Sequence, residues 1–200
     1  MNINILQNPY NKESLFKSKR NNEEGLEDKL GNFFPIVNGY PNFLANQEIT
    51  GLNKKYQKFY DKIGKWFGPL EGISSFFINF EKMRVDWLKD IAIQQGEKVL
   101  EVSVGTGWNI KCLPKTANYF GLDISKGMLD KCVKNKRKWK LNMDLCLGTA
   151  EYLPYKDESF NAVFHIGGIN FFNDRAKAIQ EMIRVAKSGT KIIIIDETEK

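Results

Sequence analysis

The feature that most constrains this chain of 200 residues is an alternation of short apolar runs and longer amphipathic segments, which starts at Lys98. Runs rich in branched apolar residues and phenylalanine predict β-strands, and they cover residues 99–102, 118–122, 143–147 and 160–166. A fifth run, 191–195, contains four consecutive isoleucines, as expected of a strand buried on both faces. The intervening segments predict helices, among them 173–187 with Met182 and Ile183 turned inward. Strand and helix in alternation predict an α/β fold built on a doubly wound, mostly parallel sheet.

The composition excludes several classes of protein. Hydrophobic residues make up 42% and charged residues 27% of the chain, as in an average globular domain. No apolar run reaches the roughly 18 residues of a membrane-spanning helix, and the first residues lack the pattern of a secretory signal. The three cysteines, at positions 112, 132 and 146, form no C-x-x-C pair, and there is one histidine. We therefore expect a cytoplasmic protein without disulfides and without a metal site.

The formal net charge of +6 is concentrated in one segment. Between Lys126 and Lys140 there are seven basic residues and one acid, and the charges in the rest of the chain cancel. Such a patch attracts nucleic acid, anionic lipid or an acidic substrate. A solvated, lysine-rich helix end would have the same composition.

The chain before the alternation divides into two parts. Residues 1–50 predict a small β-hairpin module, with a strand over 32–37, a turn at Asn38-Gly39 and a return strand over 40–44, preceded by an exposed loop over Lys17–Lys29. Residues 51–96 predict a helical region, with helices over 53–67 and 81–95. Residues 97–200 form the predicted α/β core.

A glycine-rich turn and a carboxylate mark a ligand site. Gly105-Thr106-Gly107 follows the first core strand, where backbone without a Cβ can approach a ligand closely. Asp123 ends the second strand, and the two strand ends are neighbours in a doubly wound sheet. A carboxylate there can accept both hydrogen bonds of a ribose diol, which indicates a nucleoside-bearing ligand. Asp123 could instead cap the following helix, although Ser125 is available for that. Ile110 replaces the third glycine of the dinucleotide fingerprint, which argues against a nicotinamide enzyme.

Five motifs in order resemble those of class I S-adenosylmethionine-dependent methyltransferases, and most of all the subgroup similar to ubiquinone- and menaquinone-biosynthesis methyltransferases. They are VLEVSVGTG at 99–107, GLDISKGML at 121–129, GTAEYLPY at 148–155, ESFNAV at 158–163 and EMIRVAKSGT at 181–190. This resemblance covers about residues 98–197 and implies a Rossmann-like core that binds S-adenosylmethionine. The family's sheet has two further strands after the fifth, so the resemblance also implies that this chain lacks the last strands.

The resemblance assigns roles to particular residues. Glu101 would orient the methionine end of the cofactor, partly through water to its ammonium group, while the backbone at Gly105, Thr106 and Gly107 approaches the same end and Asp123 holds the ribose. The remaining cofactor contacts it implies are Ile124 and Met128 around the adenine, Ala150 and Glu151 at the adenine edge, and His165 and Gly167 beside the methyl donor. The helix over 53–67, with Tyr56 and Tyr60, resembles the segment that covers the cofactor as a lid in this family, and an aromatic helix packed on the core is the other interpretation. His165 is a weak candidate for a catalytic base, and a packing histidine is the other interpretation.

Some positions depart from the family pattern. Ser103-Val104 stands where Gly-Cys is usual, and Thr149 stands where aspartate is common. The N-terminal segment 33–44 resembles zinc-ribbon-like modules that precede some methyltransferases. The cysteines of such modules are replaced here by Asn8 and Asn11, and amides are poor zinc ligands. We expect the module without its metal.

These features predict an enzyme that transfers a methyl group from S-adenosylmethionine to a small or lipophilic acceptor by in-line displacement. The first alternative is an RNA methyltransferase, suggested by the zinc-ribbon-like module and the Lys126–Lys140 patch. The second is a non-catalytic or truncated cofactor-binding module. The acceptor and the oligomeric state are left open by the sequence.

Overall fold

The computed structural model describes residues 1–45, 47–64 and 80–196. Its centre is a parallel sheet of five strands in the order β7-β6-β5-β8-β9. The strands are β5 Lys98–Val102, β6 Asn118–Asp123, β7 Met143–Leu147, β8 Ala162–Ile166 and β9 Ile192–Ile195. The strand order reverses beside β5, which confirms the doubly wound, Rossmann-like sheet predicted from the sequence. A crevice at the carboxyl ends of the strands follows from this topology.

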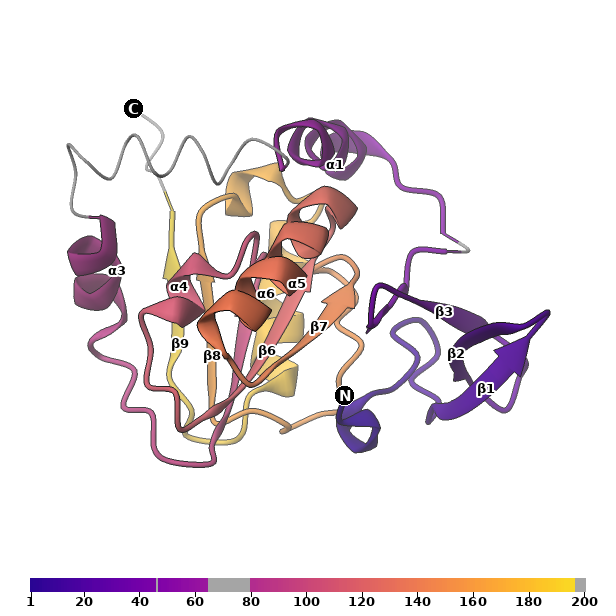
Figure 1. The fold of residues 1–200 in the computed structure, drawn as a ribbon, viewed down its shortest axis with the longest axis horizontal. Helices are drawn as coiled ribbons and strands as arrows, with labels where there is room; N and C mark the ends of the chain where they lie inside the picture. Colours follow the sequence, from indigo (N-terminus) through magenta and orange to yellow (C-terminus); the bar gives the residue numbers. More distant parts are fainter. Residues whose placement is uncertain (46, 65–79, 197–200) are drawn as a thin grey trace.

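Helices cover both faces of the sheet (Figure 1). The helices of this core are α4 Trp108–Lys111, α5 Lys126–Trp139 and α6 Arg175–Val185, with a 3-10 turn, η2, at Ile169–Phe171. On one face α5 buries Leu129 and Cys132, and on the other α6 buries Ala178 and Met182. The predicted inward position of Ile183 is wrong: its side chain is 57% exposed, because the buried stripe of α6 runs through the neighbouring positions 178, 182 and 185.

The strand with four isoleucines is less buried than its sequence predicts. In β9 every residue is half-buried or exposed, and Ile194 is 36% exposed. The reason is position, because β9 is the edge strand of the described sheet and pairs with β8 alone. Ile192 and Ile193 still pack against the cores on opposite faces of the sheet.

The N-terminal module is an antiparallel sheet in the order β1-β2-β3-β4. Its strands are β1 Phe16–Arg20, β2 Glu23–Glu27, β3 Phe33–Val37 and β4 Tyr40–Pro41. The strand over β3 and the turn at Asn38-Gly39, with φ of 52° and 87°, are confirmed. The exposed loop predicted over Lys17–Lys29 is wrong, because β1 and β2 form a hairpin there. Its turn, Asn21-Asn22, has positive φ at both residues, which asparagine tolerates. The predicted return strand is shorter than expected and ends at Pro41.

Backbone hydrogen bonds join the module to the core. Phe43 N donates to Leu147 O at the end of β7 (2.9 Å), and Gln7 N, just after the 3-10 turn η1 at Ile3–Ile5, donates to Pro154 O (3.0 Å). Leu26 and Phe34 of the module belong to the same hydrophobic cluster as the side chains of β5 and α6. The module therefore lies against the β7 end of the core, as Figure 1 shows.

Two helices precede β5: α1 Gly51–Ile63 and α3 Phe80–Leu88. Residues 65–67 of the first predicted helix lie outside the described residues. The second ends at Leu88 rather than at residue 95, because Lys89-Asp90 form a turn and residues 91–97 form no helix, with Ile91 buried. No helix within the described residues has the length and apolar character needed to cross a membrane.

Candidate functional site

A cavity of about 400 Å³ opens at the carboxyl ends of β5, β6 and β8, beneath α1. Most residues predicted from the sequence to hold a cofactor line it: Gly105, Thr106, Asp123, Ile124, Met128, Ala150 and Gly167, together with the predicted lid residues Tyr56 and Tyr60. The volume lies within the range of small-molecule sites, about 300–1,000 Å³. Glu101, Gly107, Glu151 and His165 do not line it.

The two glycines of the turn after β5 have different surroundings. Both adopt left-handed backbone, with φ of 53° at Gly105 and 84° at Gly107. A Cβ added at Gly105 would meet no atom within 4 Å, so the open space beside it is part of the cavity. A Cβ at Gly107 would lie 2.9 Å from Cys132 Sγ on α5. Gly105 therefore leaves room for a ligand, whereas Gly107 lets the turn pack against α5.

Asp123 connects the ends of β5 and β6. Its Oδ2 accepts a hydrogen bond from Gly105 N (2.8 Å), and its Oδ1 accepts one from Ser125 N (2.8 Å). Burial raises the pKa of Asp123 to about 6, against the opposing effect of these amide hydrogen bonds. Ser125 is the N-cap of α5, since its Oγ accepts from Met128 N (3.1 Å). The capping alternative for Asp123 is therefore unnecessary, and its carboxylate faces the cavity.

Glu101 lies behind the residues that line the cavity. It is linked to the lining by a hydrogen bond from Asn109. Asn109 Nδ2 donates to Glu101 Oε1 (2.6 Å), and Arg84 Nε of α3 donates to Asn109 Oδ1 (2.9 Å). Arg84 and Asn109 both line the cavity. Glu101 is fully buried, and its Oε2 has no hydrogen-bond partner among the described residues. Burial raises the pKa of Glu101 to about 8, although the hydrogen bond from Asn109 acts in the opposite direction. The carboxyl group is therefore mostly protonated near neutral pH.

The helix α1 forms an aromatic roof over the cavity. Tyr56 stacks on Phe171 of η2, with ring centroids 3.7 Å apart and an interplanar angle of 15°. On the same helix Gln57 Nε2 donates to Ile124 O (3.0 Å), and Asp61 Oδ1 accepts from Gly127 N (2.9 Å). These contacts hold α1 against the start of α5.

Besides Glu101, the side chains of two other predicted site residues are buried outside the cavity. Glu151 braces three segments: its Oε1 accepts from Asn53 Nδ2 of α1 (3.0 Å) and from the backbone N of Asn173 (3.0 Å). It faces a second cavity of about 320 Å³, which also touches Asn53 and Tyr10. His165 is fully buried, and its Nδ1 donates to Val102 O (2.9 Å). Burial lowers its pKa, although the bond to Val102 acts in the opposite direction. The ring lies outside the lining of the cavity.

In the N-terminal module an aspartate is surrounded by amides. Three side-chain amide nitrogens donate to Asp28 Oδ2: Asn8 Nδ2 (2.6 Å), Asn11 Nδ2 (2.8 Å) and Asn32 Nδ2 (2.8 Å). The described residues contain no cluster of histidine, cysteine or acidic side chains suited to a metal. Hydrogen bonds to one buried carboxylate thus join the loops that carry Asn8 and Asn11 to the loop after β2.

Comparisons with known proteins identify the family of the core. A family described as a methyltransferase domain matches residues 100–194. The demethylmenaquinone methyltransferase of Oceanobacillus iheyensis is 32% identical over 155 residues, which are 75% of this chain and 65% of that protein. The core belongs to this family of methyltransferase domains and has the class I methyltransferase fold.

Other comparisons agree with this methyltransferase fold. The protein of the same name from Staphylococcus aureus is 31% identical over 73% of this chain and 61% of its own length. The chain thus spans less than two thirds of these relatives. A putative S-adenosyl-L-methionine-dependent methyltransferase from Methanococcus maripaludis superposes with a TM-score of 0.55 and 24% identity, over 76% of this chain and 67% of that chain.

The cavity is also lined by residues that no sequence motif singles out. Asn109 and Arg84 line it, as do Phe171 and Phe172. Asn109 stands two residues after Gly107, so its spacing was a usable signal, whereas Arg84 and Phe171 reach the cavity only through tertiary packing. Ser103, where the family pattern has glycine, has a φ of 63°. A left-handed conformation explains why glycine is usual at that position.

Proposed function

We propose that this chain binds S-adenosylmethionine in the 400 Å³ cavity and transfers its methyl group to a small, lipophilic acceptor with a flat ring. The observation that carries the proposal is the buried Asp123 carboxylate at the end of β6, facing the open space beside Gly105. This arrangement suits a ribose diol next to a chain that passes close to the backbone. Bound S-adenosylmethionine supplies a methyl group that is already activated on a sulfonium.

Different residues around the cavity bind different parts of the cofactor. Asp123 holds the ribose, while Ile124 and Met128 provide apolar contact for the adenine and Ala150 presents backbone at its edge. Asn109, linked to the buried Glu101, lies on the side of the cavity suited to an amino acid ammonium. With no side chain identified as a base, the protein's contribution is proximity, orientation and exclusion of water.

The roof of the cavity supports the choice of acceptor. The stacked pair Tyr56 and Phe171 presents flat apolar surface above the cavity, and such surfaces bind flat rings through offset stacking. The relatives are named demethylmenaquinone methyltransferases. Demethylmenaquinone belongs to the same class of lipophilic ring compounds. We place the activity in the cytoplasm, where the three free cysteines stay reduced.

Calorimetric titration with S-adenosylmethionine tests the cofactor site. Because each hydrogen bond to a charged group contributes about 1.5–3 kcal/mol, Asp123→Asn should weaken binding by about a hundredfold or more. Asp144→Asn, at the opposite end of the sheet, is the matched control and should bind as the parent does. Circular dichroism and thermal unfolding verify that both variants fold. Equal affinity in Asp123→Asn, or no binding by the folded parent, would overturn the proposal.

RNA is a second candidate acceptor, favoured by one observation. On α5 and just after it, Lys134, Arg137, Lys138 and Lys140 are all exposed. Phosphate contacts would make RNA binding fall steeply with salt concentration. A steep salt slope that is lost in Lys134→Ala/Lys138→Ala would support this candidate, and salt-independent or absent binding would exclude it.

A further inference from the structure

The side of α1 that faces away from the cavity combines cations with exposed apolar side chains. One stripe along the helix, with spacings of three, four and three residues, contains Leu52, Lys55, Phe59 and Lys62. Leu52 is 42% exposed and Phe59 is 52% exposed. Neither residue lines the cavity. Two large apolar side chains thus stand in solvent between lysines on the helix that roofs the site.

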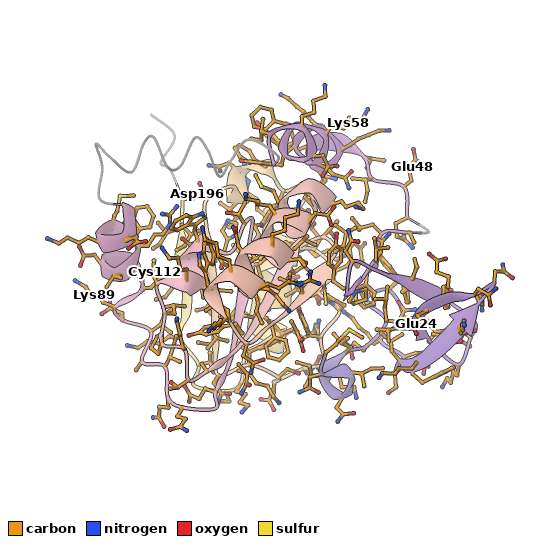
Figure 2. The ribbon with its side chains drawn as sticks, in the orientation of Figure 1. Glu24, Glu48, Lys58, Lys89, Cys112 and Asp196 are labelled. Atoms are coloured by element: carbon orange, nitrogen blue, oxygen red, sulfur yellow. The ribbon has the colours of Figure 1, made fainter. Side chains whose placement is uncertain are left out.

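The exposed charge of α1 has a single sign. Its exposed cations are Lys54, Lys55, Lys58 and Lys62. The one acid of the helix, Asp61, faces the molecule, where its Oδ1 accepts hydrogen bonds from Ser125 Oγ (2.7 Å) and Gly127 N (2.9 Å). Glu48 is exposed but lies before the helix starts. Figure 2 shows Lys58 on the outer side of α1, away from the sheet.

We propose that this outer face of α1 docks on the surface of an anionic lipid bilayer. A helix lying in the plane of a membrane needs apolar side chains that enter the acyl boundary and lysines that reach the headgroups. Leu52 and Phe59 supply the first, and the four lysines supply the second. Lysines beside an inserted helix keep their ammonium groups at the polar interface while their methylene stems lie along the apolar surface.

Two features favour a membrane over RNA as the partner of this face. Leu52 is aliphatic and offers no stacking surface for a base, whereas it suits an acyl chain. Lys54, Lys55, Lys58 and Lys62 lie on one short helix beside apolar side chains, which is the pattern of interfacial helices. Single-stranded RNA is bound instead along grooves that combine cations with aromatic platforms.

Docking by α1 would place the cavity at the membrane. The opposite side of the same helix, through Asn53, Tyr56 and Tyr60, lines the cavity. A lipophilic acceptor leaving the bilayer would therefore reach the cavity by passing around one helix. This route rests on the proposed function, whereas the docking itself does not depend on catalysis.

Co-sedimentation of the full chain with vesicles tests the docking. The chain should bind vesicles of equal parts phosphatidylglycerol and phosphatidylcholine at least tenfold more tightly than vesicles of phosphatidylcholine alone. Phe59→Ser should weaken binding by about tenfold, since a large apolar side chain no longer inserts. The matched control is Ile183→Ser on α6, whose side chain is 57% exposed on another part of the surface, and it should bind within twofold of the parent.

A second pair of variants separates the two basic surfaces. Each lysine near an anionic membrane contributes about 1 kcal/mol, or roughly fivefold in affinity. Lys55→Ala/Lys62→Ala should therefore lose about 25-fold, and Lys138→Ala/Lys140→Ala on the far end of α5 much less. Equal losses in the two pairs, equal binding to both vesicle types, or no loss in Phe59→Ser would overturn the proposal.

Two further measurements keep the proposals distinct. Binding of polyuridylate that falls tenfold in Phe59→Ser, with no vesicle binding, would assign the face to RNA and overturn the membrane proposal. Calorimetry with S-adenosylmethionine should give the same affinity for Phe59→Ser as for the parent. If the parent binds vesicles through Phe59 but binds no cofactor, the docking holds and the proposed function fails.

Discussion

Glu101 shows how a single buried carboxyl group can report on the ligand. It is fully buried, its Oε2 has no partner among the described residues, and burial raises its pKa to about 8. An ammonium group brought close by a ligand would favour the ionised carboxylate. Binding of S-adenosylmethionine near pH 7 should therefore release part of a proton, with Asn109 as the connecting residue.

Calorimetry in two buffers measures this proton. The heat of binding should be more exothermic in Tris than in phosphate, because Tris gives out more heat when it takes up the released proton. In Glu101→Gln the molar binding enthalpies in the two buffers should agree once a difference in affinity is taken into account. The same heat in both buffers for the parent chain would contradict the prediction.

At the scale of elements, the N-terminal sheet depends on the carboxylate of Asp28. Burial alone would raise the pKa of Asp28, but hydrogen bonds from Asn11, Asn32 and Asn8 outweigh it and hold that pKa well below its usual range. The folded pKa is lower than the unfolded one. The resulting stability is therefore fully present above about pH 4 and is lost as the pH falls towards the folded pKa.

Asp28→Asn should remove this contribution and lower the free energy of unfolding by about 2 kcal/mol near pH 7, because three amide donors lose their charged acceptor. Urea unfolding at a series of pH values measures it. The parent should lose stability between about pH 5 and 3 more steeply than Asp28→Asn does. Asp86→Asn, an exposed aspartate on α3, is the control and should keep the slope of the parent. An unchanged slope in Asp28→Asn would contradict this account.

The elements also show where sequence reasoning succeeds. Strands of the core were predictable because β5, β6 and β7 are buried, so their composition is apolar. The hairpin β1–β2 is not predicted because three of the five β1 residues are basic and four are exposed, and an ion pair between the strands, Arg20 with Glu27 (2.6 Å), supports it instead. The edge position of β9 depends on the neighbours it lacks in the described sheet, which no local pattern encodes.

The site, too, combines residues predicted by local sequence patterns with residues placed only by tertiary packing. Asp123 and Gly105 were predictable because a carboxylate and a glycine at adjacent strand ends are typical of a nucleoside site in a doubly wound sheet. Phe171 and Arg84 were not, because an aromatic or a cation next to a helix is common and only the tertiary structure places these two at the cavity. His165 is a candidate only by its position at the end of β8, and its side chain is buried and does not line the cavity.

For the whole molecule, the shared hydrophobic cluster predicts one cooperative unfolding transition for module and core. All four tryptophans stand at positions 66, 87, 108 and 139, outside the module. Leu26 of β2 is fully buried in the cluster that also contains Leu100 and Val102 of β5. Leu26→Ala should therefore lower the stability reported by tryptophan fluorescence by about 3 kcal/mol.

Urea titrations followed by tryptophan fluorescence and by far-ultraviolet circular dichroism should coincide in the parent and in Leu26→Ala. As a comparison, Leu30→Ala removes a leucine of the module that is 66% exposed, and it should change the midpoint little. If Leu26→Ala does not change the urea midpoint followed by tryptophan fluorescence, the module unfolds separately from the core.

The hydrogen bonds between the first residues and residues far along the chain also bear on folding during synthesis. Asn2 N donates to Asp144, 142 residues later, and Lys12 meets Glu181, 169 residues later. A ribosome releases the N-terminal residues first, so these residues emerge long before their partners exist. Contacts of such separation form slowly. In the nascent chain the segments of the first strands therefore expose Leu26 and Phe34 until their partners have been synthesised. A chaperone that binds apolar segments would act mainly in the interval before residue 181 emerges.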